Sequence, residues 1–110
     1  MLQVIGTAKS KDTQKAVRYL KERNIPFQFV DLTRYSLSPK EWKSILSSVS
    51  DTDDIIDKES QYYKKNGYAW RDYDPEEEVI LHPELLVLPV LRKDGKAVVG
   101  WDNDNPEVFL

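Results

Sequence analysis

Val4 to Leu20 reads VIGTAKSKDTQKAVRYL, and this stretch decides the fold of the chain. It begins with a short β-branched run that ends at Gly6, a pattern typical of a buried strand. Ser10 follows a small polar loop and is a good N-cap, because its hydroxyl can accept from the amide of Thr13. We therefore predict a strand at 2–5 and a helix that opens at Ser10.

The predicted helix leads into a second strand. Apolar residues recur on one helical face at Ala16, Val17 and Leu20. Asn24 can close this helix, and Pro26 prevents its continuation. Residues 27–32 then read as a strand, because apolar and polar side chains largely alternate. Strand, helix and strand within residues 2–32 predict a βαβ unit with parallel strands.

Residues 38–83 are predicted to form a helical insert. Its start is marked by Ser38-Pro39-Lys40-Glu41, a capping box with proline at the first helical position. Shorter helices are expected around Ile55 and Ile56, at 60–65, and from Asp74 to His82. Five aromatic residues lie here without clear periodicity: Tyr62, Tyr63, Tyr68, Trp70 and Tyr73.

Residues 85–101 are predicted to form a β-hairpin. Asp94-Gly95 is a strong signal for a tight hairpin turn, so strands at 87–92 and 96–101 should pair antiparallel. Pro89 interrupts the first strand, and proline in a strand belongs at an edge or at a special bond. The fold class is therefore α/β with a mixed sheet.

Composition limits the function classes. The 110 residues fit one domain, 1–110, with a polar end in which we expect one turn at Pro106. The net charge is −3 and no basic run is present, which argues against direct binding of nucleic acid. No stretch is apolar enough to span a membrane, and no signal-peptide pattern is visible, so we predict a cytoplasmic protein without a membrane partner. The absence of cysteine excludes disulfides and thiolate metal sites.

Four segments carry a resemblance to a known family: Lys9–Ala16 (KSKDTQKA), Asp54–Ser60 (DIIDKES), His82–Val90 (HPELLVLPV) and Gly95–Gly100 (GKAVVG). In this order and spacing they resemble the arsenate reductase (ArsC)/Spx family of glutaredoxin-like proteins, across essentially the whole chain. The nearest likeness is to the small arsenate reductase-related branch. The resemblance implies a thioredoxin fold of the ArsC/Spx type: βαβ, a helical insertion, then a ββ hairpin.

The same resemblance implies a thiol-redox role, with the nucleophile at position 10 and a cis proline at Pro89 facing it. The family motif, however, has cysteine where this chain has Ser10, and arsenate reductases keep an oxyanion-binding arginine where Leu88 stands. A helix N-terminus lowers a thiol pKa from about 8.5 to roughly 3.5–7.5. A serine hydroxyl stays protonated without a strong adjacent base. His82, the only histidine, is expected to end a helix.

We therefore predict that Ser10 marks the catalytic position of the family without its activity. Thiol oxidoreductase or arsenate reductase chemistry would require cysteine natively at position 10. Natural degeneration and an engineered Cys→Ser change both remain open. The preferred function is a glutaredoxin-like, arsenate reductase-related protein that has lost its nucleophile.

A weak anion or glutathione site is the ligand hypothesis for the opening of the first helix, where free amides attract anions. The residues assigned to it are Lys9, Lys11, Thr13, Lys15, Pro89 and Arg92, together with Ser10. The alternative is a solvated basic face without a ligand. No other cofactor and no metal is expected, because the acidic run at 51–57 lacks the glycine of a calcium loop.

The alternative function is a protein-binding adaptor. Members of the Spx type act by binding RNA polymerase rather than by catalysis, so the resemblance also implies a regulator without redox catalysis. The aromatic group of residues 62–73 could supply a partner surface, since such residues are enriched at interface cores. The alternative is that these residues pack the insert helices against the sheet.

Overall fold

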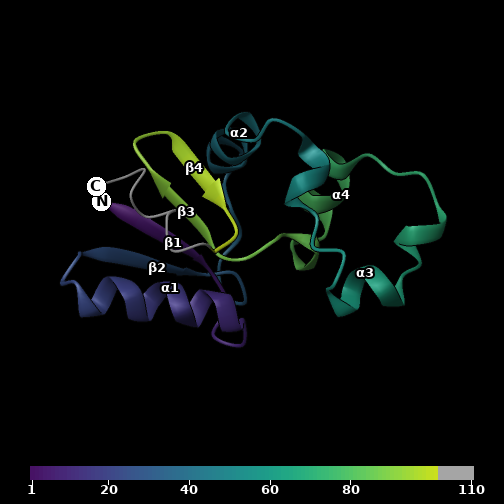
Figure 1. Ribbon diagram of the computed structural model, residues 1–110. Coiled ribbons are helices and arrows are strands. Elements are labelled where there is room, and N and C mark those ends of the chain that lie inside the picture. The colour runs from purple at the N-terminus through teal and green to yellow at the C-terminus, as the bar shows by residue number, and fades with distance from the viewer. Residues whose placement is uncertain (102–110) are drawn as a thin grey trace.

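A computed structural model of the protein describes residues 1–101, and it contains a four-stranded sheet of order β2-β1-β3-β4 (Figure 1). The strands are β1 (Leu2–Gly6), β2 (Phe27–Asp31), β3 (Val90–Lys93) and β4 (Lys96–Val99). β1 is parallel to β2, and β3 is antiparallel to both β1 and β4. This mixed sheet has the predicted thioredoxin-like topology. The turn expected at Pro106 lies outside the described residues.

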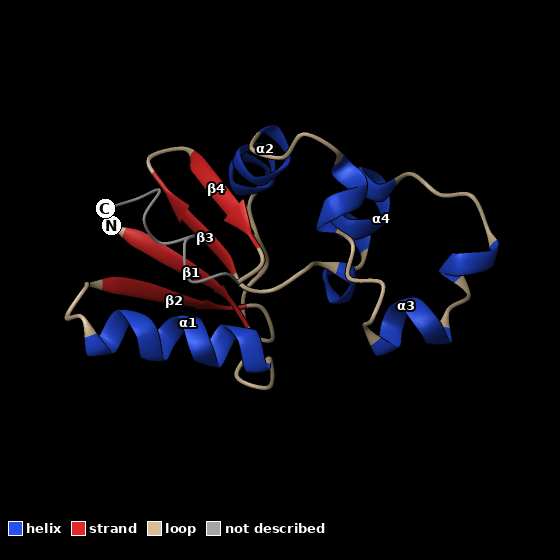
Figure 2. Ribbon diagram, viewed as in Figure 1, coloured by secondary structure: helices blue, strands red, loops and turns tan. Residues whose placement is uncertain are grey.

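Helix α1 (Lys11–Glu22) covers one face of the sheet (Figure 2). Successive side chains of a strand point to opposite faces, and Leu2 and Val4 pack with Ala16 and Leu20 in one buried cluster. Asn24 closes the helix as predicted. It takes a left-handed φ of 55°, and its amide donates to the carbonyl of Lys21.

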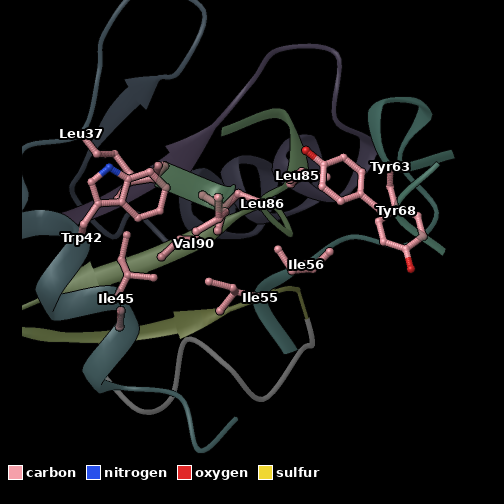
Figure 3. Packing of buried hydrophobic residues seen from close by; sticks show 13 residues of the cluster. Leu37, Trp42, Ile45, Ile55, Ile56, Tyr63, Tyr68, Leu85, Leu86 and Val90 are labelled. Carbon is pink, nitrogen blue, oxygen red and sulfur yellow. The ribbon is translucent and has the colours of Figure 1, made fainter. Parts of the chain in front are cut away.

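Helix α2 (Pro39–Ser47) lies beside the hairpin and covers part of the other face. The predicted capping box is confirmed: Ser38 Oγ accepts from the Glu41 amide, and Glu41 accepts from the Ser38 amide. Trp42 and Ile45 of this helix share a buried cluster with Ile5 and Val90 of the sheet, as Figure 3 shows for several members.

The rest of the insert consists of short helices: η1 (Thr52–Ile55), α3 (Gln61–Lys65), η2 (Tyr68–Trp70), α4 (Pro75–Leu81) and η3 (Pro83–Leu85). Two of these helices begin at a side-chain cap: Ser60 Oγ accepts from the Tyr63 amide, and the Asp74 carboxylate accepts from the Glu76 amide. Ile55 and Leu85 join the same apolar cluster as α2, so the insert shares its core with the sheet.

The hairpin pairs antiparallel as predicted, but its strands are shorter than expected. Leu86 forms a bridge with Ile56, and the Val87 amide donates to the Ile55 carbonyl at 2.8 Å. These bonds tie the start of the apolar run to η1, so β3 begins only at Val90, after a cis Leu88–Pro89 bond. Within residues 1–101 we find no helix of the length and hydropathy needed to cross a membrane.

Candidate functional site

The candidate site lies where β1 ends and the chain enters α1. The Ser10 amide donates to the Thr7 carbonyl at 3.2 Å, and Gln14 Nε2 donates to the Ala8 carbonyl at 2.6 Å. Ser10 Oγ accepts from the Thr13 amide at 3.2 Å, so the predicted cap is confirmed. A hydroxyl that accepts this bond caps the helix, and the loop is closed by its own hydrogen bonds.

Thr13 lies behind this loop and is 1% exposed. Its side chain packs on Gly6, and its Oγ1 has no hydrogen-bond partner within residues 1–101. From the sequence, this hydroxyl was expected at the anion site. The structure buries it against β1, because this position of α1 faces the end of the strand at Gly6.

The lysines assigned to the site are all exposed: Lys9, Lys11 and Lys15. Lys15 lies 3.6 Å from Asp12, whose carboxylate occupies the first turn of α1. An exposed pair of this kind contributes about 0–1 kcal/mol, and the carboxylate offsets part of the positive field of the helix start. The lysines therefore surround the helix opening without being held in one geometry.

Pro89 is buried, and the preceding Leu88 lines a cavity of about 340 Å³. The cavity is lined by Thr7, Leu32, Thr33, Pro83, Glu84 and Leu88. It brings the loop before α1 close to the residue that precedes the cis proline. None of these lining residues is basic, and Leu88 is apolar, so the cavity offers no cation to an oxyanion.

A carboxylate, that of Asp31, accepts hydrogen bonds from Thr33, which lines this cavity together with Glu84. Hydrogen bonds from the Thr33 hydroxyl and amide, at 2.7 and 2.9 Å, lower the pKa of Asp31 below its usual value of 3.8. Asp31 therefore stays ionised at the end of β2, near Thr33. This charge disfavours an anion in the cavity itself.

Arg92 is not brought to this end of the sheet. It is paired with Gln3 in the β1–β3 register, and its Nη1 donates to Gln3 Oε1 at 2.9 Å. Gln3 precedes Gly6 by three residues and points away from α1, since Leu2 and Val4 point toward it. The spacing of the sequence segments could not show the position of Arg92, because the direction of its side chain depends on the register between β1 and β3.

The aromatic group forms part of the insert core. Tyr62, Tyr63, Tyr68 and Tyr73 contact one another, with ring centroids 5.1–6.5 Å apart. Tyr68 is 2% exposed, whereas Trp70 is 92% exposed. The packing interpretation is therefore confirmed for the tyrosines, and Trp70 alone of this group stands fully in solvent.

Two larger grooves were not predicted. One, of about 700 Å³, lies between α2 and α4 and is lined in part by Trp42 and Leu81. The other, of about 680 Å³, lies between α1 and β2 and is lined in part by Val17 and Phe29. In the sequence, the apolar residues that line these grooves have the pattern of buried residues. Only the packed structure shows that the grooves beside them are open to solvent. Within the described residues, no group of His, Asp and Glu side chains could hold a metal ion.

Comparison with known proteins gives two relatives that match over more than three quarters of their own length, although no protein-family model matches the chain. The global transcriptional regulator Spx of Bacillus subtilis is 32% identical over 101 residues, which cover 88% of this chain and 77% of that protein. The global transcriptional regulator Spx 2 of Oceanobacillus iheyensis is 28% identical over 107 residues, which cover 94% of this chain and 79% of that protein.

Solved structures agree in fold. An ArsC family related protein from Bacteroides fragilis superposes with a TM-score of 0.83 at 16% identity, covering 99% of this chain and 98% of that one. The arsenate reductase from Vibrio cholerae superposes with a TM-score of 0.80 at 16% identity, covering 99% of this chain and 97% of that one. At such identities the likeness establishes the fold and leaves the activity to be argued from the site.

Proposed function

The chain belongs to the ArsC/Spx family, and from this membership we propose that it is a regulator of the Spx type that acts by binding a protein of the transcription machinery, without redox catalysis. This choice reverses the order of the two functions inferred from the sequence. The degenerate thiol-transfer protein becomes the second candidate.

The observation that carries the proposal is the state of position 10. Ser10 caps α1, and the loop before it is closed by bonds from Ser10 and Gln14. The chain contains no cysteine that could act in its place. Thiol chemistry needs a thiolate, which a chain without cysteine cannot form. Its likeness to two transcriptional regulators therefore supports a binding role for the fold rather than a redox role.

A protein partner is favoured over DNA by the charge of the chain. Residues 50–84 carry eleven acidic and four basic side chains, and the whole chain has a net charge of −3. A surface of this kind repels phosphate, on which nucleic-acid affinity largely depends. We also propose a cytoplasmic location, because the transcription machinery of a bacterium is found there.

Binding can be tested with purified RNA polymerase from Bacillus subtilis, the organism of one relative, immobilised for biolayer interferometry. We expect saturable binding of the wild type. The Ser10→Asp variant, which keeps an N-cap, should bind within about twofold of it, since no hydroxyl chemistry is involved. Duplex DNA on a second sensor is the control and should give no binding. No binding to the polymerase, or equal binding to DNA, would contradict the proposal.

Catalysis is tested separately with Ser10→Cys. We expect no glutathione-dependent disulfide reduction and no arsenate reduction, since neither Leu88 nor the lining of the adjacent cavity supplies a cation. Turnover by the cysteine variant would show that the surrounding site is intact. That result would favour a disabled enzyme over a regulator.

The second candidate, a degenerate thiol-transfer protein, would retain weak binding of glutathione or a small anion at the opening of α1. It is supported by the exposed Lys9 and Lys11 beside the free amides of a helix start. Titration with glutathione and with sulfate, followed by the amide shifts of residues 8–14, tests it. Shifts that saturate at millimolar ligand support this site, and the Lys9→Gln/Lys11→Gln variant should lose them. Unchanged shifts would reject it.

A further inference from the structure

Strand β2 leaves one edge of the sheet open. Among residues 1–101 its one strand neighbour is β1, as Figure 2 shows for the edge beside α1. The Leu32 amide donates to the Gly6 carbonyl at 3.0 Å, so Leu32 faces β1. Residues of a parallel strand alternate between facing the neighbour and facing away. The backbone groups of Phe27 and Phe29 therefore face the open edge.

The opposite edge of the sheet is protected. The Ala97 amide of β4 donates to Ser48 Oγ at 3.0 Å, and Ser44 Oγ donates to the Gly95 carbonyl at 2.9 Å. Helix α2 thus supplies partners to the hairpin. Proteins normally cover or block an edge in this way, because an uncovered strand can pair with another chain. No such partner for β2 occurs within the described residues.

An apolar groove of about 680 Å³ runs beside this open edge. Phe27 and Phe29 line it from β2, and Val17 lines it from α1. Phe29 is 37% exposed, so part of its ring is left uncovered at the groove. An added strand would place alternate side chains in this groove, which is how extended peptides are recognised at sheet edges.

Charged side chains beside the groove indicate which kind of segment could bind there. Arg18 and Lys21 line it together with Glu22. Residues 9–23 carry six basic and two acidic side chains, in a chain whose net charge is negative. Neither Arg18 nor Lys21 has an acidic group within ion-pair distance in the described part of the chain. Acidic side chains on the occupant would complement them.

We propose that the edge of β2 and the groove between α1 and β2 bind an extended segment of a partner protein that combines apolar and acidic side chains, as an added strand. A second copy of this chain fits less well. Antiparallel pairing of two β2 strands would place both α1 helices on the same face, with their Arg18 and Lys21 side chains facing each other. The site goes beyond the proposed function, because it does not depend on which protein carries the segment.

The test uses a short synthetic peptide, here called the valine–glutamate peptide, in which valine and glutamate take turns at every second position and threonine fills the positions between them. Valine and glutamate then point to the same face of the added strand, toward the groove. The peptide is titrated into the ¹⁵N-labelled full chain. We expect saturable shifts at the amides of residues 27–31 and at Val17. A valine–lysine peptide of the same length is the charge control. A valine–glutamate peptide that is N-methylated at alternate residues is the backbone control, since it cannot pair with the edge. Neither control should bind.

Variants separate this groove from general electrostatics. Arg18→Glu/Lys21→Glu should weaken binding about tenfold or more. Lys40→Glu/Lys65→Glu makes the same change in net charge on exposed residues away from the groove and should bind as the wild type does. Circular dichroism of each variant checks that it is folded.

Three results would overturn the proposal: no shifts at millimolar peptide, equal binding of the N-methylated peptide, or full binding by Arg18→Glu/Lys21→Glu. Concentration-dependent dimerisation with shifts confined to β2 would assign the edge to a second copy instead and would also overturn it. The binding of wild type to RNA polymerase is measured independently. A failure here therefore leaves the proposed function standing, and a failure there leaves this site standing.

Discussion

Gly6 and Thr13 are in direct contact: a Cβ added to Gly6 at the end of β1 would lie 2.7 Å from Thr13 Cγ2 at the start of α1. The contact sets how closely the first turn of the helix approaches the strand. Gly6 is not among the glycines with positive φ, so its small size matters here rather than its backbone freedom.

Gly6→Ala should therefore destabilise the protein by about 1–3 kcal/mol, because the added methyl overpacks this contact. Urea unfolding measures the effect. Thr13→Ala removes the atoms that clash, so the Gly6→Ala/Thr13→Ala double variant should lose less than the sum of the single changes. Additive losses would show that the two residues do not determine each other's packing.

Thr13→Val should leave the protein equally stable or more stable by about 1 kcal/mol, because it replaces a buried hydroxyl that has no partner within residues 1–101. The midpoint of urea unfolding should rise or stay constant without a change in its slope. Thr33→Val is the matched control. It removes a hydroxyl that donates to Asp31 at 2.7 Å, and it should not stabilise. A clear loss of stability in Thr13→Val would mean that its hydroxyl is satisfied.

Ser10→Ala should cost about 1 kcal/mol, because the Thr13 amide loses its cap. Ser10→Asp should retain most of the stability, since its carboxylate can accept the same bond and favours the positive end of the helix. Thermal unfolding of the three proteins compares them. If Ser10→Ala is as stable as the wild type, the cap is not the role of this residue.

Ser48→Ala should destabilise the protein by about 1–3 kcal/mol, because it leaves the Ala97 amide of the edge strand without its acceptor. Ser47→Ala is the control on the same helix, since its hydroxyl only donates to the Ser44 carbonyl, at 3.2 Å. Hydrogen exchange at Ala97 should accelerate in Ser48→Ala alone. Unchanged exchange would mean that this amide finds another partner.

Stability should fall at alkaline pH. Burial raises the pKa of Tyr68 above its usual value of 10.0, and the nearby Glu78 carboxylate raises it further. Burial likewise raises the pKa of Tyr73. The folded state then holds these protons more tightly than the unfolded chain does. This contribution is complete below pH 10 and is lost as the pH rises through the raised pKa values.

Urea unfolding at pH 8 and above pH 10 measures this fall. Tyr68→Phe/Tyr73→Phe should flatten it, because neither ring can then ionise. Tyr35→Phe is the control, since Tyr35 is 63% exposed. A fall of equal size in all three proteins would assign the alkaline loss to other groups.

The local start and stop signals were the most predictable part of the fold. The predicted caps at Ser10 and Ser38 are both present. Each depends on residues within three positions in the chain, so no distant contact is needed to form it. The start of β3 was wrong by three residues, because bonds from η1 to Leu86 and Val87 compete with the sheet for that run.

The candidate site was less predictable. Lys9, Lys11 and Lys15 lie where the sequence placed them, since they sit within one turn of the cap. The burial of Thr13 and the distant position of Arg92 depend on how α1 lies on β1 and on how β1 pairs with β3. Neither the packing of α1 on β1 nor the register between β1 and β3 can be inferred from residues that are adjacent in the sequence.

By itself the sequence determined the class of fold, the caps of α1 and α2 and the absence of a cysteine nucleophile, because these follow from local residue types and from the composition of the chain. Only the tertiary structure decided which side chains reach the surface. It buried Thr13 and the tyrosines, protected β4, and left the edge of β2 open beside Arg18 and Lys21. The physical reason is that burial depends on what packs against a residue, and those neighbours come from distant parts of the chain.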